Sequence, residues 1–176
     1  MELQYILTIS FLLISTLGTI LHFTHNWFKN GILLHIFSAV NESTWEHMKL
    51  LVFPTLVVLI LQYILLKDIY SNILNSILIL YLVEIFTIPL LYEPLRIVFK
   101  RVHFLISILI FYIAILLGIY SQYIVLSKSI YILNEYISLI LIFVLTTLFA
   151  IFTYIPPKIF LFRDPNTGKY GDEYEM

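Results

Sequence analysis

The run from Asn41 to Lys49 carries the side chains of this sequence that are best suited to chemistry. It reads Asn-Glu-Ser-Thr-Trp-Glu-His-Met-Lys, so two carboxylates, an imidazole and an ammonium group follow one another closely. Carboxylate and imidazole groups act as general acids and bases, and both bind divalent metal ions. The candidate catalytic residues are therefore Glu42, Glu46 and His47.

Two further histidines, His22 and His25, precede this run with the spacing His-x-x-His, which places both on one face of a helix. Imidazole together with carboxylate suits zinc, iron or manganese. A helix N-terminus close to Lys49 would suit an anion, such as a phosphate-like group, instead. The spacing leaves both interpretations open. The candidate metal ligands are His22, His25, Glu46 and His47, with Glu42 as an alternative to His25.

Part of the run also has a purely structural interpretation. Ser43, followed three residues later by Glu46, is a capping box in which each side chain pairs with a backbone N–H at the start of a helix. Lys49 lies at i,i+3 from Glu46, a spacing that favours an ion pair. Glu42 and His47 have the least structural explanation, which makes them the sharpest candidates for ligand binding.

The composition places these residues in a membrane protein. Of the 176 residues, 61% are hydrophobic and 12% are charged, and the mean hydropathy is +0.97. Ordinary soluble domains are less apolar and about twice as charged. The net charge of −1 gives no field that would attract nucleic acid. The absence of cysteine excludes disulfides, thiolate catalysis and Cys-ligated zinc.

Hydropathy predicts an all-α, polytopic protein with a single membrane domain over residues 1–176. Each predicted span has about the 20 residues that a helix needs to cross the hydrocarbon. The N-terminus lacks the basic stretch of a secretory signal, so we expect the first span to be retained. The five predicted transmembrane helices are Leu3–Thr24, Thr44–Leu66, Ile69–Leu91, His103–Tyr123 and Ile130–Tyr154.

The segment between the first two spans, from Trp27 to Val40, contains an apolar stretch too short to cross a bilayer. We expect a re-entrant or interfacial segment, anchored at the headgroups by Trp27 and Trp45 and able to act as a lid over the polar run. After the fifth span, Pro156-Pro157 ends the helix, and Asp164-Pro165-Asn166-Thr167-Gly168 predicts a turn within a tail over residues 155–176.

The lysines and arginines predict the orientation. Eight of the 10 fall on the side that holds the run from Asn41 to Lys49. The positive-inside rule places that side in the cytoplasm, with the N-terminus outside and the C-terminus cytoplasmic. The unusual polar residues at the ends of the spans, which include His22, His103, Glu93 and Arg96, then meet at one membrane face. The sequence therefore predicts a polar pocket that opens to the cytoplasm.

Glu84 lies inside the third predicted span, roughly 13 Å deeper than Glu93 at 1.5 Å per residue. An acidic residue in the hydrocarbon is costly, so it is by default either functional or a neutral hydrogen-bond donor. The candidate ligand-binding residues are His22, Asn41, Glu42, Trp45, Glu46, His47, Lys49 and Glu84.

Three parts of the chain together resemble a family of small bacterial integral-membrane proteins of unknown function. They are Gly18 with His22-Phe23, the Asn-Glu-Ser-x-Trp-Glu-His-x-Lys motif followed by Pro54, and the tail pattern Leu-Phe-x-Asp-Pro-x-Thr-Gly-x-Tyr-Gly. The resemblance implies a location in the bacterial plasma membrane and supplies no activity. The signature positions it carries over are His22, Asn41, Glu42, Ser43, Trp45, Glu46, His47, Lys49 and Asp164.

The connection between the third and fourth spans departs from that family's pattern. The family is richer in glycine where this chain has Tyr92-Glu93-Pro94-Leu95-Arg96, and it has an acid near Ser107. The resemblance therefore carries no role over to this connection.

Three functions stay open on this evidence. The leading one is an integral membrane protein whose polar cluster binds a small polar molecule, a lipid or a divalent metal. The second is a membrane-embedded metal-dependent hydrolase or transferase, with Glu42 or Glu46 as general base beside a metal held by His22 and His47. The third is a structural or partner-binding protein. Membrane lipid is the expected partner, nucleic acid is not, and a homo-oligomer stays open.

Overall fold

The computed structural model describes residues 3–28, 32–100 and 102–171. In this part of the chain the regular structure is helical, apart from one isolated bridge between Arg163 and Tyr170. The elements are α1 (Leu3–Trp27), α2 (Ile32–Phe37), α3 (Thr44–Leu66), α4 (Ile73–Phe99), α5 (Phe104–Ser127), α6 (Glu135–Tyr154) and the short 3-10 helix η1 (Phe160–Phe162).

Five of these helices, α1, α3, α4, α5 and α6, are long and apolar enough to cross a membrane. Large apolar side chains cover their outward faces, with Leu90 72% and Tyr136 76% exposed. Such surfaces are unfavourable in water and suit contact with lipid. The predicted fold class, an all-α protein with five apolar helices and a short segment between the first two, is confirmed.

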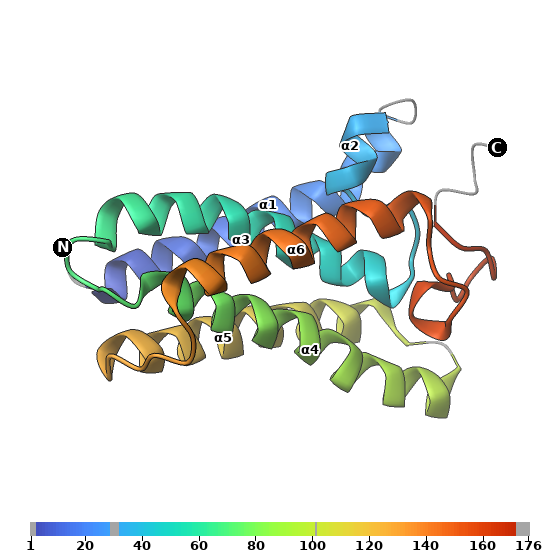
Figure 1. The fold of residues 1–176 in the computed structure, drawn as a ribbon. Helices are drawn as coiled ribbons and strands as arrows, with labels where there is room; N and C mark the ends of the chain where they lie inside the picture. The colour runs from blue at the N-terminus through green and yellow to red at the C-terminus, as the bar shows by residue number, and fades with distance from the viewer. Residues whose placement is uncertain (1–2, 29–31, 101, 172–176) are drawn as a thin grey trace.

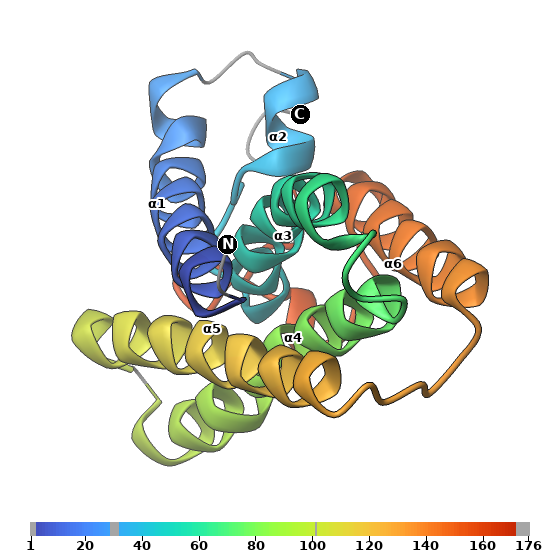
Figure 2. The ribbon, with the colours of Figure 1, turned by 90° about the vertical axis from the view of Figure 1, so that its left-hand side faces the viewer.

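The helices form a bundle in which α3 lies between α1 and α6 and packs on α4 (Figures 1 and 2). Helix α5 lies along α4 and also reaches α1. The interior between them is largely apolar and includes Leu51, Ile77, Leu80 and Ile115. It also holds buried polar side chains, such as Gln62 and Gln122. We call the end of the bundle at which α1 ends and α3 begins the motif end. The chain after α6 also lies there (Figure 1).

Helix α4 differs most from its predicted bounds, because it begins at Ile73 and continues to Phe99. The predicted end was Leu91, whereas Pro94 and the residues up to Phe99 lie inside the helix. A proline removes one backbone hydrogen bond, and the apolar residues that follow still pack as a helix. The extra turns place Glu93 and Arg96 on one helix face, where they form an i,i+3 ion pair of 2.7 Å.

Helix α6 begins at Glu135, five residues later than Ile130, because the preceding segment is held as a loop. The side chain of Asn75 accepts hydrogen bonds from the backbone N–H groups of Ile132 and Leu133, at 3.0 and 2.8 Å. The Glu135 carboxylate in turn accepts from the first N–H groups of α4. The Glu135 carboxylate thereby pairs N–H groups at the start of α4, where an unpaired N–H away from water would be costly.

The segment from Trp27 to Val40 contains the short helix α2, which packs against α6, α1 and α3. Residues 29–31, including the predicted apolar Gly31, lie outside the described residues. His35 is fully buried, and its backbone carbonyl accepts a hydrogen bond from Lys49. The segment therefore docks on the bundle at the motif end.

Candidate functional site

The start of α3 is capped as the sequence predicts, but only half of the capping box forms. The Ser43 hydroxyl accepts a hydrogen bond from the Glu46 N–H at 3.4 Å. The reciprocal bond comes from Asn41 rather than from Glu46, because Asn41 Oδ1 accepts from the Ser43 N–H at 2.8 Å. The Glu46 carboxylate accepts instead from the Val40 N–H at 3.1 Å. Glu46 is thereby directed into the protein.

Glu46 and Lys49 form a buried ion pair beneath α2 and α6. The Lys49 Nζ lies 2.6 Å from Glu46 Oε2, and the two side chains are 0% and 2% exposed. Lys49 also donates to the carbonyl of His35 at 2.8 Å and to the hydroxyl of Thr153 at 2.9 Å. These contacts tie α3 to α2 and α6. They give both charged groups partners inside the protein.

Asn41 and Trp45 attach the chain after α6 to the same place. Asn41 donates its side-chain amide to the carbonyl of Gly171 at 2.9 Å. The indole of Trp45 stacks on Phe149 of α6 at 4.0 Å and on Phe162 of η1 at 4.4 Å between ring centroids. The part of the tail up to Gly171 is therefore folded onto the motif end.

Glu42 and His47, in contrast, point away from this interior. His47 donates its Nδ1–H to the carbonyl of Ser43 at 2.9 Å. Its Nε2 then faces the Glu42 carboxylate at 3.4 Å, and the two side chains are 22% and 50% exposed. A histidine whose Nδ1 is fixed by a carbonyl presents Nε2 as the reactive or ligand-binding nitrogen. The motif thus divides into a buried pair, Glu46 and Lys49, and an accessible pair, Glu42 and His47.

His22 of α1 faces the accessible pair. Its ring centroid lies 5.9 Å from that of His47. Its Nδ1 is buried and forms no hydrogen bond with any residue that the structure describes. The ring centroid of Tyr92, from the added turns of α4, lies 6.2 Å from that of His47. Buried polar atoms are nearly always paired, so an open Nδ1 at this position indicates a missing partner such as water or a ligand.

These residues line one end of a cavity of about 600 Å³ between α1, α3, α5 and the tail, which we call the histidine cavity. Its polar lining includes His22, Glu42, His47, Tyr92, Lys100 and Asn166. Its apolar lining includes Gly18, Leu50, Phe104, Ile108 and Phe111. The cavity therefore offers both polar and apolar groups, with a volume typical of ligand sites.

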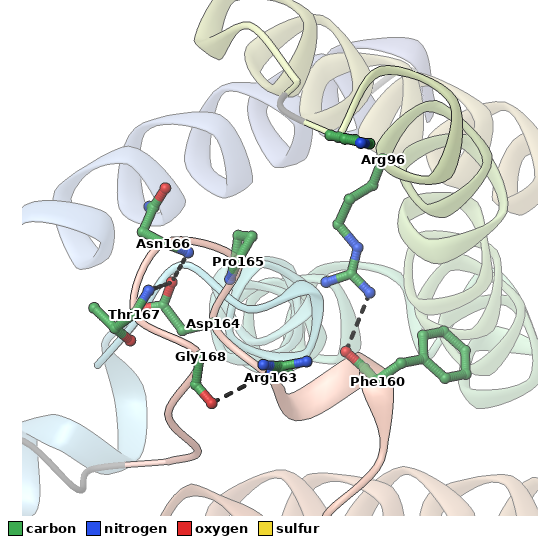
Figure 3. A pocket seen from close by; sticks show the side chains of 9 residues that line it. Arg96, Phe160, Arg163, Asp164, Pro165, Asn166, Thr167 and Gly168 are labelled. Atoms are coloured by element: carbon green, nitrogen blue, oxygen red, sulfur yellow. Dashed lines mark hydrogen bonds between the residues drawn. The ribbon is translucent and has the colours of Figure 1, made fainter.

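A second cavity of about 480 Å³ lies next to it, between the end of α4 and the tail (Figure 3). We call it the cationic cavity, because its lining includes Arg96, Lys100 and Arg163. Lys100 and Asn166 line both cavities. The wall on the tail side is a turn in which Asp164 Oδ1 accepts from the N–H groups of Asn166 and Thr167, at 2.7 and 3.4 Å. The predicted turn is thereby confirmed.

The remaining candidates lie elsewhere. The His25 ring lies 4.6 Å from that of His35 of α2, on the α2 side of the motif end. Glu84 is buried in the bundle, where its Oε2 accepts from the Thr55 hydroxyl at 2.7 Å. Neither His25 nor Glu84 lines the histidine cavity, and no residue of α2 does so within the described residues. The structure therefore brings together His22, Glu42 and His47, and separates them from His25, Glu46, Lys49 and Glu84.

The metal hypothesis can be tested against this geometry. Within residues 3–28, 32–100 and 102–171, no group of three His, Asp or Glu side chains is placed to hold a metal ion. Of the candidate ligands, Glu46 has Lys49 and the Val40 N–H as partners, and His25 lies beside α2. His22, Glu42 and His47 remain together in the histidine cavity, although they do not form such a group. The metal site stays a prediction.

The sequence did not identify the cationic cavity as a site. Arg96 was predicted to lie at the polar membrane face, whereas Lys100 and Arg163 counted only among the cations that predict the orientation. The structure brings all three to one cavity, because the tail contacts the end of α4. Tyr92 was placed in a connection and not on a helix that reaches His47. The signal that could have found the site is the concentration of cations on one side of the membrane, combined with a strong turn.

The comparison with protein families identifies one family for this chain. Residues 1–172 match the Family of unknown function (DUF6512), and the chain belongs to that family. The predicted membership of a family of unknown function is thus confirmed, while the motif positions stay a prediction. No curated protein and no solved structure matches the chain.

Proposed function

We propose that this member of the Family of unknown function (DUF6512) binds an amphiphilic, lipid-like molecule in the histidine cavity. The observation that carries the proposal is the two-part lining of that cavity. His22, Glu42 and His47 line one part, and Leu50 and Phe111 line another. A molecule with a polar head and an apolar body matches both parts at once.

The polar part offers groups that are free to bind. His47 has Nδ1 fixed by the Ser43 carbonyl, so Nε2 faces the cavity beside Glu42. His22 contributes a ring nitrogen without a partner among the described residues. An imidazole can accept from a hydroxyl or, when protonated, donate to an anionic oxygen. These groups suit the hydroxyl or charged substituents of a polar head.

The apolar part lies where α1, α3 and α5 approach one another. A Cβ atom on Gly18 would lie 2.6 Å from the Leu50 carbonyl oxygen and 2.7 Å from the Phe111 ring, so the glycine allows close packing here. Large apolar side chains near the cavity are exposed, including Phe104 at 64% and Ile108 at 46%. A hydrocarbon chain of the ligand would pack on these surfaces as the tails of membrane lipids do.

The setting that we propose is the bacterial plasma membrane, with the motif end in the cytoplasm. The support for it is the positive-inside asymmetry of the lysines and arginines and the resemblance to bacterial membrane proteins. In this orientation the histidine cavity would take its ligand from the inner leaflet.

A hydrolase or transferase acting on the bound molecule is the second candidate. The observation that favours it is the orientation of His47, whose Nδ1 is held by a carbonyl and whose Nε2 faces a carboxylate. An imidazole held in this way can act as a general base. The metal-dependent form of this candidate would use His22 and His47, with Glu42 beside them in the cavity.

Filling the cavity tests the proposed function. Thr19 of α1 lines the histidine cavity and bonds to the Ser15 carbonyl at 2.8 Å. Thr8 on the same helix is also exposed and makes the equivalent bond to Gln4 at 2.8 Å, away from the cavity. The experiment compares Thr19→Trp with Thr8→Trp by native mass spectrometry of detergent-purified protein, counting lipid molecules that remain bound.

We expect wild type and Thr8→Trp to retain lipid and Thr19→Trp to lose it. Equal retention by all three proteins would reject the histidine cavity as the binding site. Equal loss in both tryptophan variants would also reject it, because the loss would then follow from any large side chain on α1.

A further inference from the structure

We propose that the cationic cavity binds a phosphate group, and that this phosphate is part of the molecule whose apolar body lies in the histidine cavity. The ligand would then be a phosphorylated amphiphile such as a phospholipid. This inference rests on the proposed function and names the chemical class of its ligand.

The charge of the cationic cavity supports an anion. Its lining contains three cations, Arg96, Lys100 and Arg163, and one acid, Asp164. Asp164 is buried, and its Oδ1 is already an acceptor for two backbone N–H groups of the turn. Glu93 lies outside the lining and pairs with Arg96. With Glu93 counted, three cations still face two acids, and a phosphate would balance the remaining positive charge.

The two arginines are held in place and keep donors available. Arg96 Nη2 lies 2.7 Å from Glu93 Oε2 and donates to the Phe160 carbonyl at 3.2 Å, so both contacts use the same nitrogen. Arg163 donates through Nε to the Gly168 carbonyl at 3.4 Å. Figure 3 shows both side chains beside the turn that forms the wall of the cavity. Guanidinium groups with unused N–H donors match the oxygen atoms of phosphate.

Lys100 connects the two cavities. It lines both of them, and it forms no ion pair with any side chain that the structure describes. It lies directly after α4 with a φ of 57°, which turns the chain at the boundary between the cavities. A phosphate beside Lys100 would be adjacent to a group held by His22 and His47. One molecule can therefore contact both linings.

The surroundings favour a lipid phosphate over a free one. The residues immediately before Lys100 are strongly exposed and apolar: Ile97 at 78%, Val98 at 71% and Phe99 at 63%. An apolar surface directly beside three cations is the arrangement found at the boundary between hydrocarbon and headgroups. The cationic cavity thus lies beside a surface suited to lipid, where a phospholipid would present its phosphate.

The test uses titration of purified protein in a nonionic detergent, followed by native mass spectrometry, with three probes. These are phosphatidic acid, diacylglycerol with the same acyl chains, and inorganic phosphate. The variant is Lys100→Gln, and Lys158→Gln is the matched control, because Lys158 is exposed in the same tail region and lines neither cavity. Arg163→Gln provides a second variant of the cationic cavity.

We expect phosphatidic acid to bind about tenfold more tightly than diacylglycerol, since charge-assisted hydrogen bonds to phosphate are strong. Lys100→Gln and Arg163→Gln should remove most of that difference, and Lys158→Gln should preserve it. Equal affinity for the two lipids would overturn the phosphate site while leaving the proposed function standing. Binding of inorganic phosphate alone, lost in Lys100→Gln and without lipid binding, would support the anion site but overturn the lipid source and the proposed function. No binding of any probe would overturn both.

Discussion

Replacing Lys49 with methionine should destabilise the fold far more than any change at the accessible half of the motif. Methionine keeps most of the length of the side chain and removes only the ammonium group. That group lies 2.6 Å from Glu46 Oε2 in a pair that is 0% and 2% exposed. Removing it leaves a carboxylate buried without its cation, a situation that the bilayer environment makes especially costly.

The magnitude follows from the contacts of the ammonium group. Removing one partner of a buried ion pair costs about 3 to 5 kcal/mol. The carbonyl of His35 also loses its donor, and a buried acceptor without a partner costs about 1 to 3 kcal/mol. The hydroxyl of Thr153 still donates to Phe149, so it adds little. These terms are not additive, and we expect a loss of about 3 to 5 kcal/mol.

The assay is reversible unfolding in mixed micelles of a mild detergent and dodecyl sulfate, monitored by tryptophan fluorescence. The double variant Glu46→Gln with Lys49→Met is the control, because it removes the charge that the single change leaves unpaired. We expect the double variant to be more stable than Lys49→Met alone. Two results would refute the claim that this ion pair stabilises the fold. One is that Lys49→Met lowers the free energy of unfolding by less than about 1 kcal/mol, and the other is that the double variant is no more stable than Lys49→Met.

Two further predictions concern the packing at the same end. Trp45→Ala should lower the free energy of unfolding by about 3 to 5 kcal/mol and expose the tail to proteolysis after α6, because Phe149 and Phe162 lose their stacking partner. Trp27→Ala, at a site 62% exposed, is the control. Unchanged protease sensitivity of Trp45→Ala would contradict the prediction. Gly18→Ala should lower the free energy of unfolding by about 1 to 3 kcal/mol, measured by thermal unfolding, since the added Cβ would lie 2.6 Å from a backbone oxygen. If the variant is as stable as wild type, α1 moves away from α3 at no cost and the prediction is wrong.

The division of the motif could be anticipated from spacing alone. A serine three residues before a glutamate predicts a helix cap, and a lysine three residues after that glutamate predicts an ion pair, since these are local relations along one helix. Both contacts form. The same reasoning identifies Glu42 and His47 as the residues without a local partner, and they are the ones that line the histidine cavity.

Contacts between distant segments could not be anticipated in this way. Asn41 takes over half of the predicted capping box, and its amide reaches Gly171, a partner that no local rule indicates. Arg163 joins Arg96 in one cavity only because the tail folds back onto α4. Periodicity predicts which residues share a helix face, but it carries no information about which loops meet.

The end of α4 shows a different limit. The predicted span ended at Leu91, before Pro94, and proline lacks an N–H and disfavours the helical interior. The helix nevertheless continues to Phe99, and Thr44 of α3 donates to Glu93 in the continued part. A tertiary contact thus supports turns that local propensity disfavours. As a result, Tyr92 and Arg96 reach the two cavities from a helix.

The affinity of His47→Gln for phospholipid, measured together with its stability, tests the central claim most directly. The claim is that Glu42 and His47 serve a ligand while Glu46 and Lys49 serve the fold. We predict at least a tenfold loss of affinity and a free energy of unfolding within about 1 kcal/mol of wild type, because the His47 ring is partly exposed and lies outside the core. Unchanged affinity, or a loss of stability as large as that of Lys49→Met, would contradict the account.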